Sequence, residues 1–200
     1  MSPVVKFSLI AFVIIYIGVV YFWRIYSVWK KTGIWPVTYG GARTAHDLVG
    51  KVFAVLVGLS IANTVIYVAS PAIYAYLLPL RWLETMELQI TGLVAAWLSM
   101  AWTVLAQHQM GTDWRIGIDR CHPTTLVRAG LFRLSRHPIY LGVAATSASL
   151  FLAIPNLVSL GTLVGTAISV AIQARLEEEH MQQVHGTAYD AFAGKTRRWL

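Results

Sequence analysis

The chain has 200 residues, of which 56% are hydrophobic and only 12% carry a charge. Because soluble domains usually carry about 25% charged residues, this composition excludes an ordinary soluble domain and indicates a polytopic membrane protein. The net charge of +7 does not indicate a nucleic-acid partner. The cations are spread over several loops, where membrane topology and anionic lipid account for them.

Apolar residues gather in four uncharged blocks, and a membrane-spanning helix needs about 20 such residues. The blocks are Phe7–Trp23, Val52–Leu80, Leu88–Thr112 and Ile139–Gln173. Unpaired backbone groups are too costly in hydrocarbon for irregular structure, and the short alternating strands of a barrel are absent from the sequence. We therefore predict an all-α, polytopic transmembrane helical bundle.

The first two blocks predict two helices. The first block runs directly into Arg24 without the small-residue cleavage site of a signal peptide, so we expect a retained first helix. Pro71 interrupts the second block. Either the helix kinks there, or it ends and a short interfacial segment follows; we favour one tilted, kinked helix over about Leu48–Ala69, followed by a looser stretch to Leu80.

The third block predicts one helix, and the fourth is too long for a single span. Pro155-Asn156 divides the fourth block and favours a turn, which predicts a helical hairpin. The total is about five membrane helices, the last two forming the proline-broken hairpin. Small residues such as Gly142, and the GxxxG spacing of Gly161 and Gly165, predict close contact between its two arms.

Basic residues concentrate in the first-to-second and third-to-fourth connections and after the fifth helix. By the positive-inside rule, the N-terminus lies outside and the C-terminus in the cytoplasm of a cell membrane. We expect one integral membrane domain over 1–200, with membrane helices in 1–106 and a loop, the hairpin and a C-terminal segment in 107–200. The single Cys121 predicts a free thiol. The spacing of the histidines predicts no metal site.

Two clusters lie at the ends of the hairpin. Pro138 suits the first turn of a helix, which puts His137 at the N-cap, where free N–H groups favour an anion or carboxylate. Glu177, Glu178 and Glu179 are expected to end the second arm, where the helix dipole disfavours negative charge. Ionisable residues at membrane depth are candidates for function. The alternatives are a helix start with interfacial anchors and a solvated helix end.

The connection Gln109–Arg136 leads into the first cluster. Gly117 and Gly130 allow turns that other residues resist, so this loop either folds over a ligand or is solvated, with its arginines on lipid phosphates. Because a hairpin returns the chain to the same membrane face, both clusters and this loop are expected at one polar site.

Three elements together carry a resemblance to a known family. They are Gly130-Leu-Phe-Arg-Leu-Ser-Arg-His-Pro-Ile-Tyr-Leu-Gly142, then Glu177-Glu178 after an apolar hairpin, then His185-Gly-Thr-Ala-Tyr-Asp-Ala-Phe192. Over about Gln107–Phe192 the chain resembles the isoprenylcysteine carboxyl methyltransferases and the related phospholipid methyltransferases. Their pattern reads G-[PL]-[YF]-x-x-x-R-H-P-x-Y-x-G, hairpin, E-E, F-G-x-x-Y-x-x-Y. The chain departs from it at His185 and Phe192.

The resemblance implies an S-adenosylmethionine pocket and a lipophilic substrate that enters from the bilayer. It implies cofactor contacts from Gly130, Leu131, His137, Tyr140, Gly142, Glu177 and Glu178. It implies catalytic or substrate-orienting roles for Arg136, Arg175 and Glu178.

The leading hypothesis is an S-adenosylmethionine-dependent membrane methyltransferase, most like those that methylate an isoprenylcysteine carboxyl group. Three alternatives remain open. They are N-methylation of a phospholipid or amine, an NADPH-dependent reductase similar to the sterol reductases, and a non-enzymatic lipid-binding membrane protein. The sterol-reductase type generally has more helices than this chain provides. The sequence predicts no oligomeric state.

Overall fold

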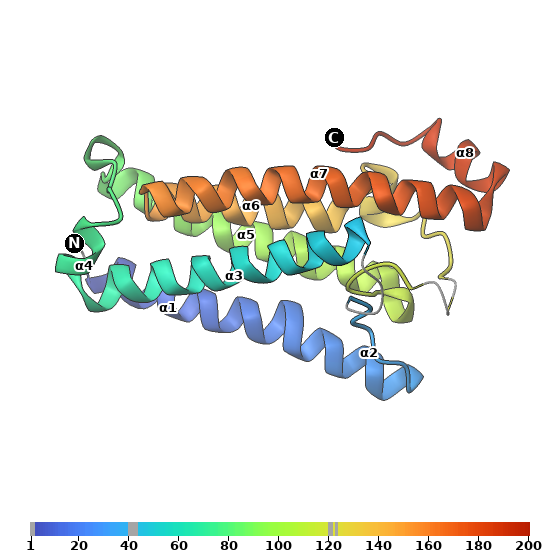
Figure 1. The fold of residues 1–200 in the computed structure, drawn as a ribbon, viewed down its shortest axis with the longest axis horizontal. Helices are drawn as coiled ribbons and strands as arrows, with labels where there is room; N and C mark the ends of the chain where they lie inside the picture. The colour runs from blue at the N-terminus through green and yellow to red at the C-terminus, as the bar shows by residue number, and fades with distance from the viewer. Residues whose placement is uncertain (1–2, 40–43, 120–121, 123) are drawn as a thin grey trace.

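The computed structural model describes residues 3–39, 44–119, 122 and 124–200, so Cys121 lies outside the described residues. Within these ranges the regular structure is helical, with only two isolated β-bridges. Four helical stretches are long and apolar enough to cross a membrane, namely Pro3–Thr32, Ala45–Ala69, Met86–Asp113 and Leu157–His185. A shorter apolar helix, Pro138–Ala153, lies among them. The predicted all-α bundle of about five membrane helices is confirmed (Figure 1).

The first membrane stretch is longer than its apolar block. It consists of α1 (Pro3–Tyr16), a π-helix η1 (Ile17–Trp23) and α2 (Arg24–Thr32) in direct succession. The side-chain amide of Gln107 donates to the carbonyl oxygen of Val20 inside the π-helix at 3.1 Å, and Arg24 donates to the carbonyl of Gln107 at 2.6 Å. π-Helical turns are rare and are frequently found at functional sites.

The next helix, α3 (Ala45–Ala69), begins with a capping box in which the Thr44 and Asp47 side chains each accept from the other's backbone. It ends before Ser70, and Pro71 is the first residue of a separate short helix, α4 (Pro71–Ala75). The helix therefore breaks at this point and does not kink. Proline is favourable as the first residue of the new helix, because the N–H that it lacks would have no partner in a first turn. The looser stretch that follows contains a single 3-10 turn, η2 (Arg81–Leu83).

The predicted hairpin is confirmed. α6 (Pro138–Ala153) and α7 (Leu157–His185) are separated by Pro155 and by Asn156, which caps α7. The buried Asn156 amide also donates to Asn63 of α3 at 2.8 Å. One expectation was wrong: the three glutamates do not end the second arm. Arg, Leu and Glu are good helix formers, so α7 continues past them to His185 before α8 (Thr187–Ala193) begins.

Small residues bring α6 closest to α5 (Met86–Met110), although α6 also packs against α7. A buried stripe on α5 consists of Gly92, Ala96, Ser99, Thr103 and Ala106. A Cβ on Gly142 would overlap the hydroxyl of Thr103, which shows how tightly the two helices pack. The predicted GxxxG contact was wrong, because a Cβ on Gly165 would meet Leu56 of α3 and one on Gly161 would meet nothing. Small residues permit close packing, but they do not choose the partner helix.

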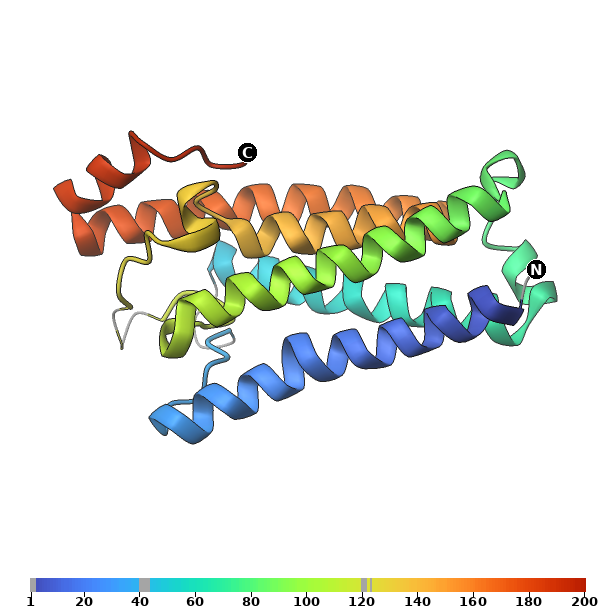
Figure 2. The same ribbon diagram turned by 180° about the vertical axis from the view of Figure 1, so that it is seen from behind.

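The bundle has two distinct ends (Figures 1 and 2). α4, the residues 76–85 and the hairpin tip lie at one end. At the other end lie the loop after α2, the connection between α5 and α6, the end of α7, and α8. This second end includes the 3-10 turns η3 (Gly111–Asp113) and η4 (Gly130–Arg133). Arg136-His137-Pro138, which we call the RHP segment, and the glutamates of α7 therefore share one end of the molecule, as the hairpin predicts.

Candidate active site

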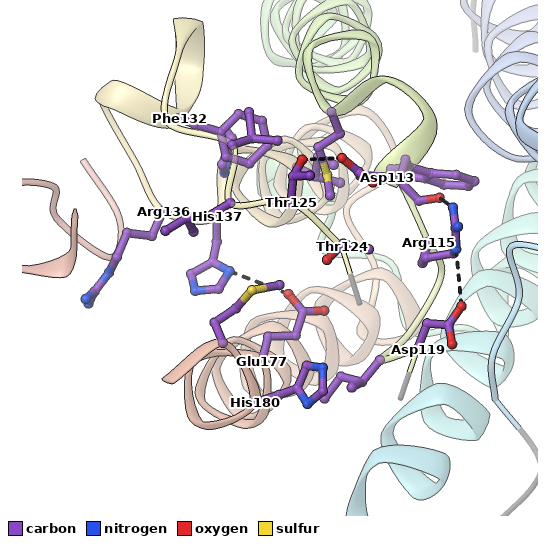
Figure 3. Close-up of a pocket in the computed structure, with 18 of the residues that line it drawn as sticks. Asp113, Arg115, Asp119, Thr124, Thr125, Phe132, Arg136, His137, Glu177 and His180 are labelled. Atoms are coloured by element: carbon purple, nitrogen blue, oxygen red, sulfur yellow. Dashed lines mark hydrogen bonds and ion pairs between the residues drawn. The ribbon is translucent and has the colours of Figure 1, made fainter. Parts of the chain in front are cut away.

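A pocket lies at this end, between the start of α6, the end of α7, α8 and the loop after α5 (Figure 3). We call it the polar pocket because charged side chains line part of its otherwise mainly apolar wall. It encloses about 140 Å³. Its walls combine acidic, basic and aromatic side chains, among them Asp113, Trp114, Arg115, Asp119, Phe132, Arg136, His137, Tyr140, Glu177, His180, Tyr189 and Phe192. Such a mixture suits a ligand with both charged and flat apolar parts.

The turn before the RHP segment depends on a glycine. Gly130 has a φ of +62°, which L side chains rarely adopt, and a Cβ there would overlap the side chain of Gln109. That side chain accepts the backbone N–H of Leu131 at 2.8 Å. The turn at Gly117 likewise has a positive φ of +100°. Both turns expected from the sequence are thus present, and η4 leads directly into His137.

His137 occupies the N-cap position of α6, as predicted, and Pro138 is the first helical residue. Its ring is 8% exposed and lies between two carboxylates. Nε2 is 3.1 Å from Glu178 Oε1, and Nδ1 is 3.8 Å from Glu177 Oε2. Because an ionised carboxylate only accepts hydrogen bonds, Nε2 carries the proton shared with Glu178. Figure 3 shows the imidazole and Glu177 pointing toward each other.

Glu177 is held by neighbours on two helices. The Tyr140 hydroxyl and the Gln173 amide both donate to its Oε1, the latter at 3.2 Å. Gln173 in turn accepts from His46 Nδ1 at 3.2 Å, and His46 Nε2 accepts the backbone N–H of Ile118 at 2.8 Å. A chain of hydrogen bonds therefore runs from the loop, through α3 and α7, to the pocket carboxylate.

Glu178 faces away from the pocket and meets two arginines. Arg136 approaches its Oε1 at 3.2 Å, and Arg198 donates to Oε1 from Nε at 2.9 Å and to Oε2 from its terminal nitrogen at 2.6 Å. The hydrogen bond to Glu178 raises the pKa of Arg198. Burial, followed by the charge of Glu178, raises the pKa of the nearby Tyr189 to about 12. Tyr189 therefore stays a neutral hydrogen-bond donor at physiological pH.

The structure brings together some of the site residues predicted from the sequence and not others. Four of them line the pocket, namely Arg136, His137, Tyr140 and Glu177. Gly130, Leu131 and Glu178 do not line it, although Glu178 contacts Arg136 and His137 of its wall. Gly142 packs against α5 instead, and Arg175 is on the exposed face of α7, away from the pocket.

Sequence reasoning missed His46, Gln173 and Arg198. Gln173 carried a signal, because an amide at the end of an apolar block of sequence is unusual at membrane depth. Among the described residues, no three His, Cys, Asp or Glu side chains are grouped as metal ligands.

A second, mainly apolar cavity of about 490 Å³ adjoins the pocket. It lies between the π-helix η1, α3 and α6, and it shares five wall residues with the pocket, namely Trp114, Arg115, Gly117, Ile139 and Tyr140. A smaller chamber of about 70 Å³ continues from it toward the middle of the bundle, as far as Phe12 and Leu150. The polar pocket thus shares a wall with an apolar cavity between membrane helices.

The family model for phospholipid methyltransferases matches residues 87–188. A comparison with curated proteins finds no match. The matched segment runs from the start of α5 to the start of α8, and it contains the RHP segment, the hairpin and both glutamates at the pocket. Since the match covers half of the chain and the helices fit a membrane protein, the chain belongs to the phospholipid methyltransferase family.

Proposed function

We propose that the protein transfers a methyl group from S-adenosylmethionine to a lipophilic acceptor within the membrane. One observation carries the proposal. The polar pocket around His137 and Glu177 meets an apolar cavity at Tyr140 and four other shared residues. A charged cofactor and a hydrocarbon-bearing acceptor can therefore approach each other from opposite sides of one wall.

The residues present fit this cofactor. Glu177 offers a carboxylate to its ammonium group. Trp114, Phe132 and Tyr189 offer flat apolar surface to an adenine ring. When bound, the cofactor supplies a methyl group already activated on a sulfonium.

The protein's own task is then mainly to position the two reactants. An in-line displacement gains most from proximity and orientation. Tyr140 is fixed by its hydrogen bond to Glu177 at the junction of the two cavities. Arg115 reaches the same junction, held by Asp119 and by the carbonyl oxygens of Thr112 and Trp114.

The side chains at the junction of the two cavities are compatible with two classes of acceptor. A carboxyl group, as in an isoprenylcysteine, fits the guanidinium of Arg115 and needs no general base because it is already ionised. This is our leading acceptor. An amine, as in a phospholipid head group, is favoured by the family match, and it must lose a proton in the reaction, for which Glu177 is the nearest base.

The cofactor proposal is tested by calorimetry on the protein in detergent. We expect S-adenosylmethionine and its demethylated product to bind, and His137→Ala to abolish binding. Binding of NADPH instead would support the reductase alternative. A failure of the wild-type protein to bind any of these nucleotides would contradict the proposal and favour a lipid-binding role.

The acceptor is tested separately. Transfer of labelled methyl to a prenylcysteine analogue supports O-methylation, whereas transfer to phosphatidylethanolamine supports N-methylation.

We also propose that the pocket faces the cytoplasm, where the cofactor is made. Lys30 and Lys31 at the end of α2, and Arg115, Arg128, Arg133 and Arg136 between α5 and α6, belong to segments at the pocket end of the bundle, which supports this orientation.

A further inference from the structure

Residues 196–199 fold back against the RHP segment, and we call them the strap. The backbone N–H of Arg136 donates to the carbonyl of Arg197 at 2.9 Å, and the hydroxyl of Ser135 donates to the carbonyl of Arg198 at 2.9 Å. Ser135 is fully buried beneath these contacts. The strap is therefore attached to the two residues that precede His137.

Two strap side chains reach the core of the site. Arg198 makes two hydrogen bonds to Glu178, whose side chain is 13% exposed. The ring of Trp199 lies 6.0 Å from the ring of His137, which also stacks on Tyr140 at 5.7 Å. The strap thus contacts both members of the His137–Glu178 pair.

The two adjacent glutamates are in different situations. Successive residues of an α-helix point about 100° apart, so Glu177 faces the pocket while Glu178 faces the strap. Glu178 is engaged by His137, Arg136 and Arg198 and does not line the pocket. Glu178 affects the pocket through His137, because the Glu178 carboxylate accepts the Nε2–H of that imidazole.

We propose that Arg198 is a positioning residue, which fixes Glu178 so that this carboxylate holds the imidazole of His137 with Nδ1 toward Glu177 and the pocket. The inference rests on the proposed function, because it assigns His137 and Glu177 to the cofactor. Removing Arg198 leaves Glu178 with Arg136 as its remaining arginine, and the imidazole loses its fixed orientation. Glu177 is left in place to bind the ligand.

The test compares Arg198→Gln with Arg197→Gln in the full chain in detergent. Both variants remove one positive charge from the strap, but the Arg197 side chain is exposed. We expect the affinity for S-adenosylhomocysteine to fall about tenfold in Arg198→Gln and to stay unchanged in Arg197→Gln. Arg198→Lys should recover part of the loss, since an ammonium replaces one of the two hydrogen bonds.

Two further measurements separate positioning from a general effect on the fold. In the double variant Glu178→Gln/Arg198→Gln, binding should be no weaker than in Glu178→Gln alone, because Arg198 acts through that carboxylate. The labelled imidazole resonance of His137, identified by its loss in His137→Ala, should shift in Arg198→Gln and not in Arg197→Gln.

The resonance needs no cofactor, so it tests the inference even if wild-type protein binds no S-adenosylhomocysteine and the proposed function fails. An unshifted resonance, or additive losses in the double variant, would overturn the positioning role.

Discussion

Glu177, Glu178 and Glu179 are consecutive in the chain, yet each side chain has a different environment. Glu177 accepts hydrogen bonds from Tyr140 and Gln173 and lines the pocket. Glu178 is bound to basic groups and does not line the pocket. Glu179 is exposed. Three identical residues therefore provide a set of matched variants within one turn of α7.

We expect Glu177→Gln to weaken cofactor binding roughly ten- to a hundredfold, because a hydrogen bond to a charged group contributes about 1.5–3 kcal/mol. Glu179→Gln makes the same change at an exposed position outside the pocket and should leave binding unchanged. Calorimetry with S-adenosylhomocysteine measures both. Equal affinities in the two variants would remove Glu177 from the cofactor site.

At this scale the sequence predicts the residues of a contiguous pattern. His137, Tyr140 and Glu177 follow from the RHPxY and EE elements, and the structure brings all three to one pocket. Arg198, His46 and Gln173 belong to no such pattern. Their roles depend on side-chain contacts between helices far apart in the chain, such as the 127-residue separation of His46 and Gln173, which local spacing does not specify.

Among the elements, the hairpin determines which residues meet. It was predictable because proline and asparagine interrupt an apolar run that is too long for one span. The length of α7 was not predictable from the sequence, because its last turns are polar and give no hydropathy signal. The partner of α6 was also unpredictable, since α5 and α7 both carry small residues.

Gly142→Ala tests the packing of α6 on α5. The added Cβ overlaps the Thr103 hydroxyl, and overpacking of this kind costs about 1–3 kcal/mol. Gly161→Ala is the control, because its Cβ meets nothing and alanine is the better helix former. Denaturant titration in mixed micelles should show a loss of stability for Gly142→Ala alone. If Gly142→Ala instead lowers cofactor affinity at full stability, Gly142 belongs to the binding site.

Across the whole molecule, the cavities form a row in which each shares a wall with the next. The polar pocket, the apolar cavity and the inner chamber each share wall residues with the next, and Val57 of α3 lines both the apolar cavity and the chamber. This arrangement was not predictable from the sequence, because a cavity depends on how several helices diverge. It fits an acceptor whose hydrocarbon chain lies in the bundle while its reactive group is at Tyr140.

We expect Val57→Phe to lower kcat/KM for the acceptor by about tenfold or more, as obstruction of an apolar pocket does, without changing cofactor affinity. Val55→Phe adds the same ring to the lipid-facing side of α3, where Val55 is 61% exposed, and should have no effect. Methyl transfer assays at varied acceptor concentration distinguish the two variants. Equal activity would place the acceptor elsewhere.

The short length of α6 has a consequence for how the reactants meet. Its 16 residues span about 24 Å, less than the roughly 30 Å of the hydrocarbon core. Because α6 begins at Pro138 while the neighbouring α5 and α7 are longer, the pocket lies close to the level at which the hydrocarbon core begins. A lipid in the surrounding leaflet then has its head group near the level of the pocket. It reaches the reaction by sideways diffusion, without the cost of withdrawing its chain from the membrane, which is about 0.8 kcal/mol for each methylene exposed to water.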